Sequence, residues 1–205
     1  VSFSYVGTGK GAYIIKETTA IGKIFEYTGA QSGDYAPLSK LAAPDKLQIA
    51  VSTLKYNPNN KTNLQAEVAF SNKDQNLFSD KDDADNTGAA TKIAWKQTYT
   101  DKKWLVQTEV DVDYLDTDFK SIERIYNVEF NRDWNLQNPE GNQKFIQSKL
   151  KLSNKKNTTV SYGYQNLSFG SSFQGYKHLL QSKITTKNTK FRGSTSFLKN
   201  NSTTE

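Results

Sequence analysis

Four aspartates lie close together in one polar stretch of the sequence, and the chemistry that they suit best is the binding of a cation. They are Asp80, Asp82, Asp83 and Asp85. Closely spaced carboxylate oxygens are the hard ligands that Ca²⁺ prefers. The stretch lacks the glycine and the closing glutamate of an EF-hand loop, and a solvated acidic loop explains the same residues. The sequence therefore offers one candidate metal site, for calcium, although a solvated loop is the favoured interpretation.

A glycine-rich stretch near the start imitates a phosphate-binding loop. The run Gly7-Thr-Gly9-Lys-Gly11-Ala12 resembles the fingerprint of dinucleotide-binding folds. Such folds need a helix directly after the glycines, whereas 12–20 is short and β-branched, and no alternating helices follow downstream. We therefore interpret these glycines as turn residues and expect no nucleotide cofactor.

The chain contains few residues that could support nucleophilic or metal-assisted catalysis. There is no cysteine and only one histidine, which excludes disulfides, cysteine-ligated metals, thiol nucleophiles and any multi-histidine site. His178 shares its parity with Tyr176, Leu180 and Ile184, which suggests a structural side chain. We expect a protein that is not an enzyme and that has no cofactor apart from the calcium question.

The net charge is mildly basic, with 27 Lys and Arg against 21 Asp and Glu. The clearest lysine pairs, Lys102-Lys103 and Lys155-Lys156, fall in short polar turns, where they aid solubility. Carboxylates on the same strand faces reduce the positive field that nucleic acid needs. We therefore expect no nucleic-acid partner.

The first part of the chain, 1–45, contains a short repeat and forms one expected domain. The pattern Tyr-x-Gly-x-x-x-Gly-x-Tyr occurs at 5–13 and again at 27–35. Each copy follows a β-type stretch, and glycine permits the positive φ that tight turns require. The repeat predicts two small units of strand and glycine turn.

From residue 46 to 205 the hydrophobic period is two, which predicts a second, all-β domain. About eight alternating segments are expected, each of about 9–12 residues, which is long for a soluble strand and right for a tilted membrane strand. One face is apolar and the other is charged. The apolar face includes Leu64, Ala66, Val68, Phe70, Trp104, Val106, Val110 and Val112. The charged face includes Glu67, Lys92, Lys96, Glu109, Asp111 and Asp113.

Short and long connections alternate between these segments. Polar turns are expected at 57–61, 101–103, 154–157 and 187–188, and long loops at 72–90, 115–142 and 166–175. An antiparallel meander then has tight turns at one end and long loops at the other, as in transmembrane barrels of the outer membrane. Within the second loop, 119–134 has the spacing of an amphipathic helix, with a β excursion around 125–130 as the rival.

Two stretches, NLQAEVAFSNKDQNLFSDKDDADNTGAA at 63–90 and SIERIYNVEFNRDWNL at 121–136, resemble large, poorly characterised outer-membrane and cell-surface β-barrel proteins of Bacteroidota. Those proteins also carry segments like Tyr5–Tyr13 followed by a proline-containing linker such as Ala36-Pro37-Leu38. The resemblance covers 1–136. It implies a β-rich protein at the outer membrane or cell surface, and it brings no catalytic residues.

Together these observations predict an antiparallel meander that belongs to an outer-membrane β-barrel, with outer-membrane lipid and other envelope proteins as partners. Its function would be that of a non-catalytic scaffold, pore or receptor-type subunit of an envelope complex. Because strand-like sequence begins at the first residues and ends just before the last, we expect a fragment of a larger protein. The alternative is a soluble cell-surface β-sandwich or barrel that binds a ligand such as a glycan, because alternation alone does not distinguish the two.

Overall fold

The structure is a computed structural model, and it describes residues 2–37, 43–79, 81, 83–154 and 158–202. The chain divides into two compact units, Val1–Ala43 and Pro44–Glu205. Each unit is built around an antiparallel β-sheet, and the described helices are two single-turn segments, η1 (Asp83–Asp85) and α1 (Phe130–Trp134). The all-β fold that the alternation predicts is therefore confirmed.

The N-terminal unit is a four-stranded sheet in the order β1-β4-β2-β3. Its strands are β1 (Ser4–Tyr5), β2 (Tyr13–Thr19), β3 (Gly22–Tyr27) and β4 (Tyr35–Ala36). The two copies of the repeat meet at its centre, where Gly11 and Gly33 exchange two backbone hydrogen bonds of 2.7 and 3.1 Å. The neighbouring bonds match as well, because Ala12 N donates to Tyr35 O and Asp34 N donates to Tyr13 O, both at 2.9 Å. The repeat therefore packs against itself about a local twofold axis.

Aromatic rings follow the same local symmetry. Phe3 and Phe25, which occupy equivalent positions in the two copies, stack with their centroids 4.3 Å apart. Tyr13 lies 4.8 Å from Phe3, and Tyr35 lies 5.1 Å from Phe25. The Phe3–Phe25 stack thus joins the two copies, and each tyrosine packs on the phenylalanine of its own copy.

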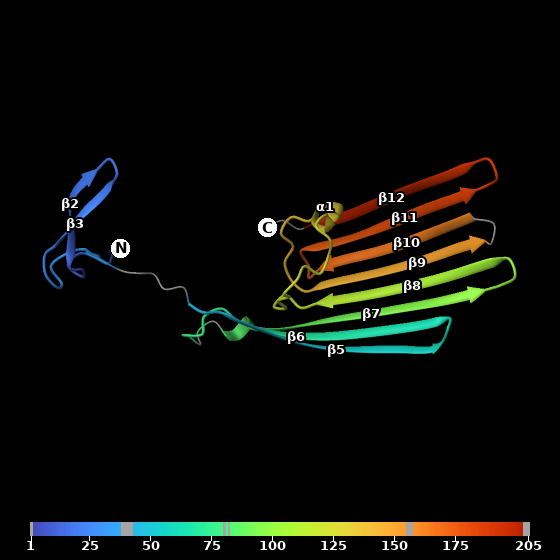
Figure 1. Cartoon of the computed structure of the whole chain (residues 1–205), viewed down its shortest axis with the longest axis horizontal. Helices are drawn as coiled ribbons and strands as arrows, with labels where there is room; N and C mark the ends of the chain where they lie inside the picture. The colour runs from blue at the N-terminus through green and yellow to red at the C-terminus, as the bar shows by residue number, and fades with distance from the viewer. Residues whose placement is uncertain (1, 38–42, 80, 82, 155–157, 203–205) are drawn as a thin grey trace. The chain divides into compact units, whose positions relative to one another are not determined.

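The second unit is one sheet of eight antiparallel strands joined in sequence order, from β5 at one edge to β12 at the other (Figure 1). The strands are β5 (Lys46–Asn59), β6 (Thr62–Asp74), β7 (Thr87–Thr100), β8 (Trp104–Leu115), β9 (Gln143–Asn154), β10 (Thr158–Phe169), β11 (Phe173–Thr185) and β12 (Lys190–Ser202). All eight expected strands are present, and with 12–14 residues they are longer than expected. The sheet is open, with no pairing between β5 and β12, so the closed barrel stays a prediction.

The register separates the two faces as the alternation predicts. Glu67, Lys92 and Asp113 are successive cross-strand partners on β6, β7 and β8, so they share the polar face. Leu64, Trp95 and Val110 form a matching row on the apolar face. The apolar face runs through all eight strands, and many of its large side chains are exposed, including Leu54, Phe70, Ile93, Tyr99, Leu150, Tyr162, Leu180 and Phe197.

Two expectations about connections are wrong. The loop expected at 166–175 is a tight turn, because β10 continues to Phe169, β11 begins at Phe173, and Gly170 adopts a φ of +44° that suits a sharp reversal. The stretch 119–134 forms neither a long amphipathic helix nor a strand. It is irregular except for α1, a helix of 5 residues that ends at a left-handed Asn135.

Buried apolar side chains gather at one place in the sheet unit. Among the described residues, Trp134, Phe145, Leu167 and Phe173 form the buried cluster, with Tyr126, Phe130, Leu136, Phe169 and Leu198 packed around it. Figure 1 shows α1 at the end of the sheet opposite the tight turns that join β5 to β6, β7 to β8 and β11 to β12. The register places Phe145 and Leu167 on the polar face, in the row of Asp113. The core therefore lies where the loop 116–142 folds onto that face.

Candidate functional site

A row of carboxylates on β8 forms the acidic part of the polar face. Alternate residues of a strand point to the same side, so Glu109, Asp111 and Asp113 project together. Lysines on β7 oppose two of them: Lys96 Nζ lies 2.9 Å from Glu109 Oε1, and Lys92 is the cross-strand partner of Asp113. Opposite charges therefore face each other on the neighbouring strands β7 and β8.

The loop 116–142 crosses this face and is held by strands on both sides of β8. At one side, the backbone N–H of Lys120 donates to Ser71 Oγ at 2.9 Å, and the loop passes so close to Gly88 that a Cβ there would lie 2.2 Å from Phe119 N. At the other side, Asn200 Nδ2 donates to the carbonyl oxygen of Trp134 at 2.8 Å. The loop is therefore anchored from β6 and β7 across to β12.

Trp134 is the central anchor of this loop, with 2% of its surface exposed. Its ring meets Phe145 edge to face at 5.6 Å, and Lys177 Nζ lies 4.7 Å from its centroid in a cation–π contact. The same ammonium donates to the carbonyl oxygen of Asp133 at 3.1 Å. One lysine of β11 thus fixes both the ring and the backbone of α1.

Tyr126 ties the loop to the acidic row. Its hydroxyl donates to Asp113 Oδ2 at 3.2 Å and accepts a hydrogen bond from Gln143 Nε2 at 2.8 Å. Burial, with the nearby Asp113 charge as a second cause, raises the pKa of Tyr126 above its usual value. Asp113 Oδ1 is buried and has no hydrogen-bond partner among the described residues. Within the described part of the chain, the Asp113 carboxylate therefore relies on the Tyr126 hydroxyl as its hydrogen-bond donor.

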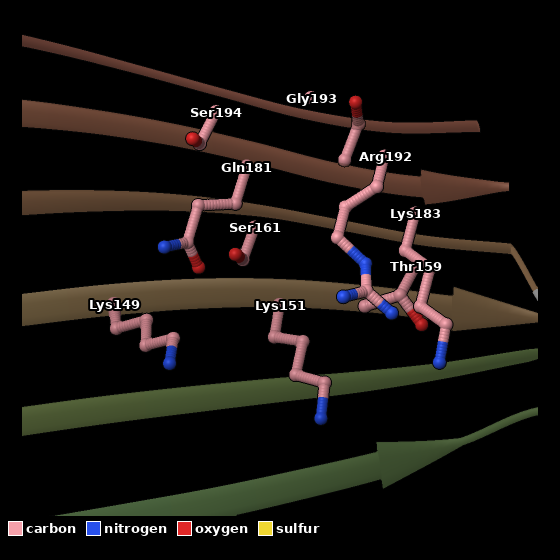
Figure 2. Close-up of a pocket in the computed structure, with 10 residues that line it drawn as sticks. Lys149, Lys151, Thr159, Ser161, Gln181, Lys183, Arg192, Gly193 and Ser194 are labelled. Carbon is pink, nitrogen blue, oxygen red and sulfur yellow. The ribbon is translucent and has the colours of Figure 1, made fainter.

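A basic groove lies on the same face of the sheet, toward the tight-turn end of β11 and β12 (Figure 2). Its cations are Lys149, Lys151, Lys183 and Arg192, and the polar side chains between them include Thr159, Ser161, Gln181 and Ser194. The groove has a volume of about 520 Å³. No carboxylate lines it among the described residues, in contrast to the row on β8.

The residues predicted to hold calcium are only partly described. Asp80 and Asp82 lie outside the described residues, whereas Asp83 and Asp85 belong to η1. Asp83 Oδ1 accepts a hydrogen bond from Asn86 Nδ2 at 2.9 Å. Over the described ranges, no three His, Cys, Asp or Glu side chains are grouped so as to hold a metal. The calcium site remains a prediction.

His178 and the glycine motif have structural surroundings. His178 lies on the apolar face, its Nδ1 2.7 Å from the Tyr162 hydroxyl, with Tyr164, Tyr176 and Phe197 rings nearby. The residues after Gly11 form β2 rather than a helix, and Gly7 and Gly9 adopt positive φ at a turn. The glycine motif is therefore a turn in a β-hairpin unit.

Sequence reasoning missed the basic groove and the anchoring of the loop. Both depend on which residues become partners across strands, a relation that alternation within one strand does not give. The short β11–β12 connection was the available signal, because a tight hairpin turn fixes the register that sets Lys183 opposite Arg192.

None of the protein-family models, curated proteins and solved structures compared with this chain matches it. Helices in the described ranges are too short and too polar to span a lipid bilayer.

Proposed function

We propose that the Pro44–Glu205 unit is a segment of a transmembrane β-barrel in an outer membrane, and that it acts as a non-catalytic scaffold, pore or receptor-type subunit of an envelope complex. The observation that carries the proposal is the apolar face, which extends over eight consecutive strands with large side chains exposed. A folded protein in water rarely leaves so wide an apolar surface uncovered. Lipid is the environment in which such a face is stable.

Strand length supports the same proposal. Strands of 12–14 residues extend over about 41–48 Å, which at a tilt of about 40° gives a height of about 31–37 Å. The hydrocarbon core of a bilayer is about 30 Å thick. Strands in soluble sheets are usually about half as long.

The polar face then lines the interior of the barrel. Its charges are compensated in part between neighbouring strands, as in the Lys96–Glu109 pair, which suits an interior wetted by water. The loop 116–142 lies on this face, so it would fold into the lumen and narrow it at one end. An eight-stranded barrel has an interior just filled by its own side chains, so this inward loop favours a wider barrel that contains further strands.

Fractionation of the native protein tests the proposal. We expect it to remain with outer membranes through high-salt and carbonate washes, and to be released only by detergent. Release into buffer as a folded monomer would contradict the membrane location and favour a soluble surface module, for which glycan binding is the next assay.

A further inference from the structure

The basic groove is an ordered array of cations and hydroxyls, fixed by the register of four strands. Thr159, Lys183 and Arg192 are successive cross-strand partners on β10, β11 and β12. The adjacent row on the same face runs from Lys151 through Ser161, Gln181 and Ser194. In the row beyond, Lys149 is opposite Gly163, and the side chain of Leu179 packs beside that glycine. Positive charges thus lie on β9 and near the turn that joins β11 to β12, with small polar groups between them (Figure 2).

Within the described part of the chain, the charges in this array are offset in part by Glu109, which interacts electrostatically with Lys149 and Lys151. Lys183 and Arg192 are direct cross-strand partners, and like charges in this position destabilise a sheet. None of the four cations lies in an ion pair with a described carboxylate. Glu109, the cross-strand partner of Lys149, already pairs with Lys96 on its other side. An anion in the groove would remove this repulsion.

The groove suits an anion with several oxygens. A guanidinium binds a phosphate through two parallel N–H···O bonds, and lysine ammonium groups add charge from other directions. The hydroxyls of Thr159, Ser161 and Ser194 and the amide of Gln181 can donate to the remaining oxygens. Among the described residues the lining has no aromatic side chain for a base to stack on, so the array does not favour single-stranded nucleic acid.

We infer that this groove binds a phosphate-type oxyanion, either free phosphate or the phosphate of a monoester. The site lies on the polar face, so it does not depend on what covers the apolar face. It goes beyond the proposed function by naming the class of solute that the interior of the barrel would attract.

The test is thermal unfolding of the full chain in a maltoside detergent, with circular dichroism as the readout. Phosphate should raise the midpoint in a saturable way, whereas sodium chloride at the same ionic strength should not. Arg192→Gln should weaken phosphate binding about tenfold or more, since it removes a charge-assisted pair of hydrogen bonds. Without phosphate the same variant should unfold at a higher temperature than the wild type, because the repulsion with Lys183 is gone.

Two further variants make the result specific. Lys199 also lies on β12 but is on the opposite face, so the Lys199→Gln variant should bind phosphate like the wild type. Arg192→Lys keeps the charge and loses the planar fork, so its affinity should fall between those of the wild type and Arg192→Gln. A sugar phosphate tested beside inorganic phosphate distinguishes the two sources of the anion.

Several results would overturn the inference. They are an effect of phosphate no larger than that of chloride, an equal loss in Lys199→Gln, and a lower midpoint of Arg192→Gln without phosphate. If the chain folds in plain buffer and not in detergent, the membrane proposal fails, and the same titration in buffer still tests the groove.

Discussion

In the N-terminal unit the two copies of a short repeat pack their aromatic rings against each other, whereas the eight-stranded sheet leaves an apolar face uncovered by the described residues. Phe3 stacks on Phe25 across the local twofold axis. On the sheet, Phe70 and Phe197 are each 60% exposed, although they lie in well-formed strands. A repeat that pairs with itself brings its own partner, and a meander with one apolar face requires a partner from outside. The sheet is therefore the unit whose stability depends on its surroundings.

The loop 116–142 is where the sheet unit buries apolar side chains with its own residues, so removing its anchor should have the largest effect. Trp134→Ala should cost about 3–5 kcal/mol, as for other large aromatics deleted from a core. Hydrogen exchange should increase in 116–142 and much less in the central strands. Ile122→Ala, in the same loop but 80% exposed, is the matched control and should change little. Equal protection of the loop in both variants would show that the buried cluster does not hold it.

Adding a charge to the apolar face should destabilise the protein far more than adding one to the polar face. Val110→Lys should cost about 2–4 kcal/mol in a membrane, because the ammonium would lie in the hydrocarbon region. Gln147→Lys, on the polar face opposite Asp111, should fold nearly as well as the wild type. The folded fraction after refolding into detergent, read from heat-modifiable mobility on gels, measures both. Similar folding of the two variants would contradict a lipid-facing surface.

The local symmetry of the N-terminal unit predicts that equivalent substitutions in the two copies of the repeat have equal effects on stability. A Cβ on Gly11 would lie 2.4 Å from Tyr35 O, and one on Gly33 would lie 2.5 Å from Tyr13 N. Gly11→Ala and Gly33→Ala should therefore each destabilise this unit by about 2–3 kcal/mol. Hydrogen exchange should rise over 2–36 and stay unchanged in the sheet unit. Thr18→Ala, an exposed position on β2, provides the comparison. Very different effects of the two glycine variants would contradict the twofold arrangement.

The smallest effect is expected at Tyr126, which bonds the loop to the acidic row. Tyr126→Phe should cost about 1–2 kcal/mol, because Asp113 loses the hydrogen bond from the phenol. The raised pKa of Tyr126 means that the folded state keeps the phenol protonated above pH 10.0, where a free tyrosine ionises, so stability should fall as the pH rises past this value. The phenylalanine variant should show less of this alkaline loss in urea unfolding at graded pH. An unchanged alkaline profile would argue against this role.

Strand positions were predictable because alternation reports directly on the two faces of a sheet. Leu64 to Phe70 and Val106 to Val112 carry the pattern clearly, and both lie in strands. Strand ends were missed where the apolar side chains change face, as at Asn166–Phe169. There Leu167 lies on the face opposite to Tyr162, so the alternation is interrupted although the pairing with neighbouring strands continues.

The loop and the groove were less accessible to sequence reasoning. Residues 119–134 have helical spacing, yet Tyr126, Phe130 and Trp134 meet strand residues from β8 to β12, so tertiary contacts override the local pattern. The Lys183–Arg192 pair depends on register between strands. The repeat at 5–13 and 27–35 was visible, but the exchange of hydrogen bonds between Gly11 and Gly33 follows only from how the two copies pack.

The native tryptophans allow the most direct test of the central claim, that the apolar face contacts lipid. Trp95 lies on that face, whereas Trp134 is buried with the loop on the other. One variant keeps only Trp95 and a second keeps only Trp134, with the other tryptophans changed to Phe in each. Both variants are reconstituted in vesicles of lipids with brominated acyl chains, which quench tryptophan fluorescence. We expect strong quenching of Trp95 fluorescence and little quenching of Trp134. Equal quenching, or none at Trp95, would contradict this claim.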